Sequence, residues 1–225
     1  MKARVSVFAG AFAVLLNSAA AGAMTMEVRG DQLIASGRIV ADDGDRFRKL
    51  VDANSNVKTV VLWNSPGGSA RANDAITETI ETLGLNTVVT GFCVSACAMV
   101  FLAGKDRAFG DLEPIGSTSL GFHASYVDGH LAPDRRLAAL KARVLDRTRG
   151  KIDPALVDRW LHLNDERNSV RFRYPGDSTP GPTTYFCPLG RFPNAGDYRR
   201  CDAIPNTSAL SAGIVTSTDI VHVNR

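Results

Sequence analysis

Short apolar runs alternate with amphipathic helical patterns along the middle of the chain. Residues 57–63 (VKTVVLW) and 86–90 are β-branched and apolar, as buried parallel strands are. Between them, Ala72, Ile76 and Ile80 fall on one helical face, and Gly84 suits the position just after a helix. This alternation predicts an α/β domain with a largely parallel sheet.

The flanking segments extend the same pattern. We expect a hairpin around Gly30, a helix within 42–53, a buried helix over 95–104, and extended chain at 106–110 and 115–125. Two amphipathic helices follow, the second opened by Asp153 and Pro154, a favourable N-cap and first-turn pair. Residues 170–205 are rich in Pro, Gly, Arg and Asp and predict an irregular insertion. The chain should end with a short helix and a strand within 208–223.

The N-terminus has the pattern of a secretory signal peptide. Two basic residues precede an apolar run, and Ala21-Gly22-Ala23 fits a cleavage site, which predicts a signal peptide over 1–23 and one domain over 24–225. The apolar run is too short to span a bilayer, so we expect a periplasmic or secreted protein without a membrane span in its mature form. Removing residues 1–23 takes two positive charges from a net +3, and the balance of about +1 gives no reason to expect nucleic acid as a partner.

Export also bears on the four cysteines, which lie at positions 93, 97, 187 and 201. An oxidising compartment favours two disulfides, of which three connectivities exist, and proximity in sequence favours Cys93–Cys97 and Cys187–Cys201. The spacing does not suit a zinc site, and we expect no metal. Cys93 and Cys97 bracket Ser95, and adjacent thiols that pair are not nucleophiles.

Two glycine-bearing turns follow the two predicted strands and should face one crevice, because sites in open α/β folds gather at the carboxyl ends of strands. Ser95 begins a buried helix after the second turn. Backbone N–H groups of Ala96 and of Gly67 or Gly68 would form an oxyanion hole, each donor worth about 3 kcal/mol of transition-state stabilisation. His123, in a polar extended segment, is the best candidate for the base.

These motifs, NSPGG, then GFCVSA, then a histidine about thirty residues on, resemble those of the proteolytic subunit of the Clp protease (ClpP) and its periplasmic relatives. The resemblance is strong over residues 57–124 and implies the crotonase-type ββα superhelix with a helical handle. It implies Ser95 as nucleophile, His123 as base, and Gly68 (or Gly67) with Ala96 as oxyanion hole. ClpP assembles into rings, so a homo-oligomer is also an expectation.

The resemblance also suggests an acid for the triad. Asp202 precedes a segment similar to the Gly-Leu-Val motif of ClpP and is the first choice, with Asp165 and Asp177 as runners-up. A lysine base, from Lys105, Lys141 or Lys151, is a rival, but none has an apolar setting that would lower its pKa. The sequence around the other histidines, at positions 130, 162 and 222, gives no sign of a catalytic role.

The sequence therefore predicts an exported serine peptidase that needs no ATP, metal or organic cofactor. Its substrates would be peptides or unfolded protein segments, bound by strand addition along residues 117–123. A ClpP-like binding module without turnover, and an esterase or thioesterase on the same fold, are the alternatives.

Overall fold

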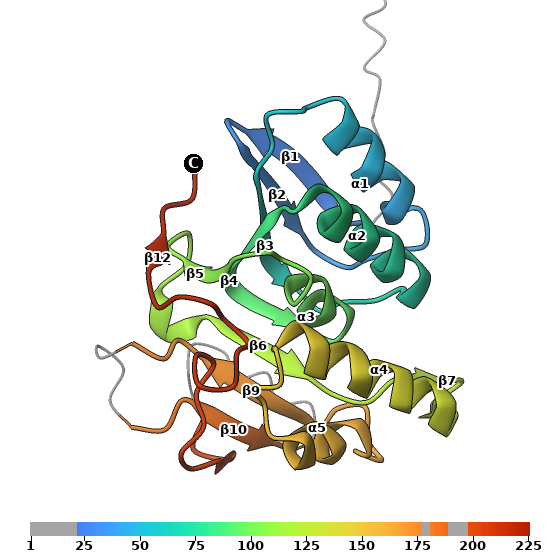
Figure 1. Cartoon of the computed structure of the whole chain (residues 1–225), viewed down its shortest axis with the longest axis vertical. Coiled ribbons are helices and arrows are strands. Elements are labelled where there is room, and N and C mark those ends of the chain that lie inside the picture. The colour runs from blue at the N-terminus through green and yellow to red at the C-terminus, as the bar shows by residue number, and fades with distance from the viewer. Residues whose placement is uncertain (1–21, 177–180, 189–197) are drawn as a thin grey trace, which may run out of the picture.

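A computed structural model of the 225-residue chain describes residues 22–176, 181–188 and 198–225. Its main sheet has the order β1-β2-β3-β4-β6-β9-β10-β11, and β5 pairs with both β4 and β12 (Figure 1). The strands are β1 (Thr25–Arg29), β2 (Gln32–Ser36), β3 (Thr59–Ser65), β4 (Asn86–Val94), β5 (Arg107–Gly110), β6 (Ser119–Phe122), β9 (Ser169–Arg173), β10 (Thr184–Cys187), β11 (Asp202–Ala203) and β12 (Ile220–Val221). A separate hairpin joins β7 (Tyr126–Val127) to β8 (His130–Leu131).

The helices lie where the hydrophobic pattern predicts them. They are α1 (Asp43–Asp52), α2 (Ala70–Leu83), α3 (Ala96–Phe101), α4 (Asp134–Arg147) and α5 (Pro154–Leu161), with a 3₁₀ turn, η1, at Ile115–Ser117. The Ser69 hydroxyl caps α2 by accepting the N–H of Ala72, and Gly84 ends that helix in the left-handed conformation. The Asp153 carboxylate caps α5 in the same way. Among the described residues, no helix combines the length and apolarity needed to cross a bilayer.

The parallel core of the sheet confirms the α/β prediction. Strands β2, β3 and β4 run parallel, and β4 is parallel to both β5 and β6. Residues 87–89 of β4 pair with β5, whereas residues 92–94 pair with β6, so the sheet forks along this one long strand. The fork brings the end of β4 beside β6.

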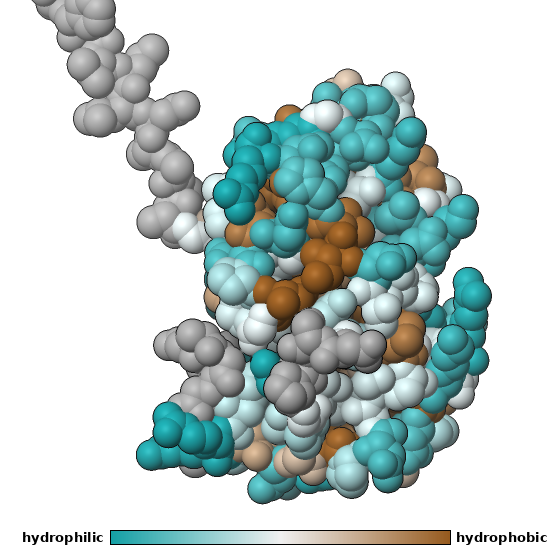
Figure 2. Space-filling model, turned by 90° about the vertical axis from the view of Figure 1, so that its left-hand side faces the viewer, coloured by the Kyte–Doolittle hydropathy of each residue, from teal (hydrophilic) through white to brown (hydrophobic). Residues whose placement is uncertain are grey.

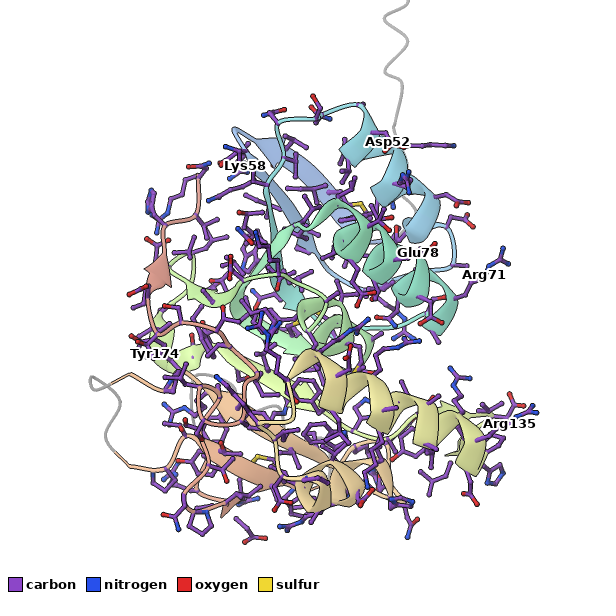
Figure 3. The ribbon with its side chains drawn as sticks, in the orientation of Figure 1. Asp52, Lys58, Arg71, Glu78, Arg135 and Tyr174 are labelled. Atoms are coloured by element: carbon purple, nitrogen blue, oxygen red, sulfur yellow. A yellow bond between two sulfur atoms is a disulfide. The ribbon has the colours of Figure 1, made fainter. Side chains whose placement is uncertain are left out.

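Apolar side chains divide between the two faces of the sheet. The main core lies between the sheet and α1–α5, with Trp160 of α5 stacked on Phe122 of β6 at 4.8 Å between ring centroids. The outward face of α2 is charged, and Arg71 and Glu78 point away from the sheet (Figure 3). A smaller cluster around Val61 and Val223 covers the opposite face of β2–β4. Figure 2 looks onto the β12 side and shows an apolar patch there among polar residues.

The C-terminal segment docks on this scaffold through backbone groups. The buried guanidinium of Arg107 donates to the carbonyls of Gly213 and Ile214 at 2.9 and 2.8 Å, and burial lowers the pKa of Arg107 to about 10. The Tyr174 hydroxyl, at the left of Figure 3, donates to the carbonyl of Thr218. The segment therefore closes the domain by long-range contacts.

Two local predictions near the C-terminus are wrong. Residues 208–214 form turns instead of a helix, because the hydroxyls of Ser208 and Ser211 accept each other's backbone N–H and Gly213 is left-handed. Residues 170–205 are not simply irregular: they contribute most of β9, together with β10 and β11. Val170 and Phe172 alternate with arginines in β9, which is the two-residue period of a strand, although Arg171 is buried as well.

Candidate active site

Ser95 lies at a sharp turn between β4 and α3, where it is partly buried. Its backbone has φ 60° and ψ −126°, a conformation that a residue with a side chain rarely adopts. The Ser95 N–H donates to the carbonyl of Gly121 at 2.9 Å, which fixes the turn beside β6. A strained serine between a strand and a helix is the arrangement that exposes a nucleophile at the edge of a sheet.

A disulfide encloses this turn. Cys93, in β4, and Cys97, in α3, are bonded and fully buried in the main core, as the sequence predicted. The second predicted pair, Cys187–Cys201, is also present and joins β10 to the start of β11. The first bond links the two elements that meet at Ser95, so it restrains the backbone on both sides of the serine.

The Pro-Gly-Gly turn packs directly against Ser95. A β-carbon on Gly67 would lie 2.5 Å from the Val94 carbonyl oxygen and 2.7 Å from the Ala96 nitrogen, so only glycine fits there. The Pro-Gly-Gly turn after β3 and the Ser95 turn after β4 therefore meet at one place, as expected, although Gly91 lies within β4, which continues to Val94.

Of the two glycines, Gly68 is the better second donor for an oxyanion hole, beside Ala96. The Ile39 carbonyl accepts the Ser69 N–H, and the Ile39 N–H donates to the Gly67 carbonyl, both at 2.9 Å. Because Ile39 and Gly68 form a parallel bridge, the N–H of Gly68 points away from Ile39. The Gly67 N–H is occupied by the Ser65 hydroxyl. Among the described residues, the backbone N–H groups of Gly68 and Ala96 have no hydrogen-bond partner. They are the two donors available for an oxyanion.

His123 follows β6 and is half-buried. Its Nδ1 lies 2.6 Å from the carbonyl oxygen of Ala124. A carbonyl can only accept, so Nδ1 carries the proton and the neutral ring keeps Nε2 as a proton acceptor. Burial lowers the pKa of His123, the Ala124 carbonyl opposes that shift, and the Arg171 cation adds to it. His123 is thus a neutral base with a fixed tautomer.

Among the described residues, no hydrogen bond joins the Ser95 hydroxyl to the His123 imidazole. The strands that carry them are neighbours, however, because Val94 pairs with Gly121, two residues before His123. Catalytic hydrogen bonds are often long in the absence of substrate and tighten when it binds.

The structure does not bring Asp202 to His123. Asp202 lies in β11, three strands from β6, and it is exposed. Asp202 pairs with Phe186, which in turn pairs with Val170 of β9. Directly paired residues lie on the same face of a sheet, so Asp202 lies on the face of Val170. Arg171 and Gly121 lie on the opposite face. Resemblance to a local motif could not reveal this placement, because the strand order is set by pairing with β9 and β10.

The runners-up do not replace Asp202. The Arg167 side chain and backbone N–H lower the pKa of Asp165 to about 2, so that carboxylate is already paired with Arg167. Asp177 lies outside the described residues. The Glu166 charge opposes the lowering of the His123 pKa, but less than the Ala124 carbonyl does.

The sequence analysis missed Glu166. It follows α5 in an exposed loop, and no periodicity marks it. The Tyr126 hydroxyl binds the carbonyl of Leu163, which fastens this loop to the hairpin after His123. The Tyr126 and His123 rings lie 5.8 Å apart, centroid to centroid. The adjacent Asp165 and Glu166 were a visible acidic pair, but sequence alone could not say which one affects the pKa of the histidine.

The rival bases are solvated or already paired. Lys141 Nζ binds the Asp158 carboxylate at 2.6 Å, and Lys105 and Lys151 are exposed. His123 is the base that the geometry favours.

The expected strand addition along 117–123 is wrong for most of that segment. Strand β6 already pairs with β4 on one side and with β9 on the other, so residues 119–122 offer no free edge.

Part of the chain is similar to a known protein family. The Clp protease family model matches residues 47–109, which include Gly67, Gly68, Ser95 and Ala96. No curated protein matches the chain. Among solved structures, ClpP1 from Listeria monocytogenes is 15% identical, covering 87% of this chain and 93% of its own, with a TM-score of 0.48. A Pseudomonas aeruginosa protein, PA4980, is 16% identical, covering 86% and 75%, with a TM-score of 0.47.

A third solved structure is a mutant of 1510-N, a membrane-bound stomatin-specific protease. It is 14% identical, with 57% of this chain and 67% of that chain covered and a TM-score of 0.42. The family match spans the strand, turn and helix that build the candidate nucleophile and oxyanion hole. Over residues 47–109 this chain is similar to the Clp protease family.

Proposed function

We propose that this protein is a serine peptidase that cleaves peptides or unfolded protein segments without ATP. The observation that carries the proposal is the turn at Ser95, where a strained serine packs against the Gly67-Gly68 turn and two backbone donors have no partner in the described part of the chain. A strained residue held by its surroundings is a mark of a functional site.

Each group then has a chemical role. The Ser95 hydroxyl attacks the substrate carbonyl carbon while His123 Nε2 takes its proton. The N–H groups of Gly68 and Ala96 hold the oxyanion of the tetrahedral intermediate. The imidazolium gives its proton to the leaving amine, and water then hydrolyses the acyl ester on Ser95 by the same steps in reverse order.

The Ala124 carbonyl takes over one task of a triad acid, because it fixes the tautomer of His123. It supplies less charge to stabilise the imidazolium than a carboxylate in direct contact would. Glu166 adds a weaker, solvent-screened charge. We therefore propose a Ser95–His123 dyad, slower than a complete triad, in place of the predicted arrangement with Asp202.

Location and assembly belong to the same proposal. The predicted signal peptide, together with the two disulfides, supports export to an oxidising compartment. An ATP-driven unfoldase is not expected there, which is why the substrates should already be unfolded. The resemblance to ClpP supports a homo-oligomer, which light scattering on the purified protein measures.

The test is hydrolysis of a reduced and alkylated protein by the processed enzyme, followed by mass spectrometry of the fragments without ATP. Ser95→Ala and His123→Ala should each abolish cleavage. Ser55→Ala and His162→Ala change exposed residues of the same two types and should leave cleavage intact. Cleavage that survives Ser95→Ala would overturn the proposal.

A binding module without turnover is the second candidate, because Ser95 and His123 are not hydrogen-bonded and Asp202 is far along the sheet. That function predicts saturable binding of the alkylated protein with no fragments. Hydrolysis of small acyl esters, but not of peptides, would instead indicate an esterase.

A further inference from the structure

The backbone nitrogen of Met24 is buried against a carboxylate. The Met24 residue is 2% exposed, and its N–H lies 3.3 Å from Asp43 Oδ2. The Asp43 side chain is fully buried at the start of α1. A buried carboxylate at a backbone nitrogen is a strong site for a positive charge, because little water competes for it.

The Asp43 carboxylate has enough acceptor sites to bind an ammonium group. Its Oδ1 accepts Arg46 Nη1 at 2.5 Å, and its Oδ2 accepts the Val40 N–H at 2.7 Å as well as that of Met24. The Arg46 guanidinium also reaches the Met24 carbonyl at 3.1 Å. A carboxylate has about four lone-pair sites, and three donors occupy this one. Replacing one neutral donor by an ammonium keeps the same geometry.

The sequence points to the same bond independently. The Ala21-Gly22-Ala23 pattern predicts that a signal peptide is cut after Ala23, which would make Met24 the first residue. We propose that the Ala23–Met24 bond is the maturation site, and that the new α-ammonium of Met24 forms a buried ion pair with Asp43. The proposal goes beyond the peptidase function and does not depend on it.

The covalent step is a hydrolysis by a signal peptidase. Water adds across the peptide bond, its oxygen goes to the Ala23 carbonyl carbon, and the Met24 nitrogen leaves as an amine that takes up a proton. The cut precedes folding, since the folded chain buries Met24.

The buried N-terminus stabilises the backbone beside the candidate active site. Asp43 holds the N–H of Val40, and the neighbouring Ile39 makes the two hydrogen bonds that hold Gly67 and Ser69. The ion pair therefore anchors the segment on which the oxyanion turn rests.

The first measurement is the intact mass of the full-length protein after expression in an exporting bacterium. We expect a chain that begins at Met24. A second version carries an added Ser-Gln pair between Ala23 and Met24, so that the processed chain begins two residues earlier, as its mass would verify. This extension turns the ammonium at Met24 back into a peptide N–H.

A thermodynamic cycle then isolates the ion pair. The extension should lower Tm by roughly 4 °C or more, on the scaling for a chain of this size, in the wild type and in Asp45→Asn. Asp45 is an exposed carboxylate in the same helix turn and serves as the matched control. In Asp43→Asn the extension should change Tm by less than about 1 °C.

Three results would overturn the proposal: a mature chain that begins elsewhere, an extension without effect on the wild-type Tm, or an equal effect in Asp43→Asn. If Asp43→Asn does not fold, the effect of the extension on wild type and the intact mass still decide the question. Neither measurement uses peptidase activity, so a failed peptidase proposal would leave this one standing.

Discussion

Substituting Gly67 by alanine should disrupt the candidate site, because the added methyl group would meet the backbone of the Ser95 turn. Gly67 has φ 83°, and the added carbon would lie 2.5 Å from the Val94 carbonyl oxygen and 2.9 Å from the Ser95 β-carbon. Real β-carbons essentially never approach backbone atoms so closely, and backbone cannot swing away like a flexible side chain. Either the Pro-Gly-Gly turn or the Ser95 turn must move.

Two other glycines separate the contributions. Gly84 has φ 61° with open space around it, so Gly84→Ala measures the backbone cost alone, about 1–2 kcal/mol. Gly116 has open space and no positive φ, so Gly116→Ala should change stability by less than about 0.5 kcal/mol. Gly67→Ala adds overpacking to the backbone cost and should lose about 2–5 kcal/mol.

The assay is urea unfolding of the four proteins, with the rate of fluorophosphonate labelling measured under folded conditions. We expect labelling by Gly67→Ala to be slower by about tenfold to a hundredfold, because a displacement of 1 Å can cost that much. Gly84→Ala and Gly116→Ala should label at the wild-type rate. A Gly67→Ala protein as stable as Gly84→Ala, with unchanged labelling, would refute the packing of this turn against Ser95.

Three further predictions follow from the environment of the site. Because His123 must be neutral to act as base and burial lowers its pKa, activity should fall on acidification only below the ordinary value of 6.5, as a pH–rate profile would show. Glu166→Gln removes a charge that raises this pKa, so the acidic limb should move to still lower pH, and an unchanged limb would contradict the role of Glu166. Replacing the Cys93–Cys97 pair by alanines should cost about 2 kcal/mol in unfolding experiments, less than the roughly 3 kcal/mol for the Cys187–Cys201 pair, yet it should slow labelling of the serine more. The reverse order of labelling rates would count against a local role for the first disulfide.

Local patterns predicted the central elements of the fold well. The spacing of Ile76 and Ile80 with Gly84 at the end sufficed for α2, and the β-branched run sufficed for β3, because both signals are short-range. The bond between Cys93 and Cys97 was predictable for the same reason. The meeting of the turns after β3 and β4 followed from a general rule about parallel strands.

Long-range pairing was not predictable in the same way. The sequence does not say that β9, which follows two helices, returns to pair with β6, and that pairing closes the edge expected to bind substrate. The same pairing starts the series β9-β10-β11, which carries Asp202 away from His123. The role of the Ala124 carbonyl was hidden too, since a backbone acceptor leaves no mark in a sequence.

The central claim is that Ser95 is a nucleophile activated by His123, and mapping a covalent adduct tests it most directly. The processed, oxidised protein is treated with a fluorophosphonate, digested and sequenced by mass spectrometry. We predict a single adduct on Ser95, lost in His123→Ala and kept in His162→Ala. An adduct on another serine, or none on the folded protein, would contradict the account.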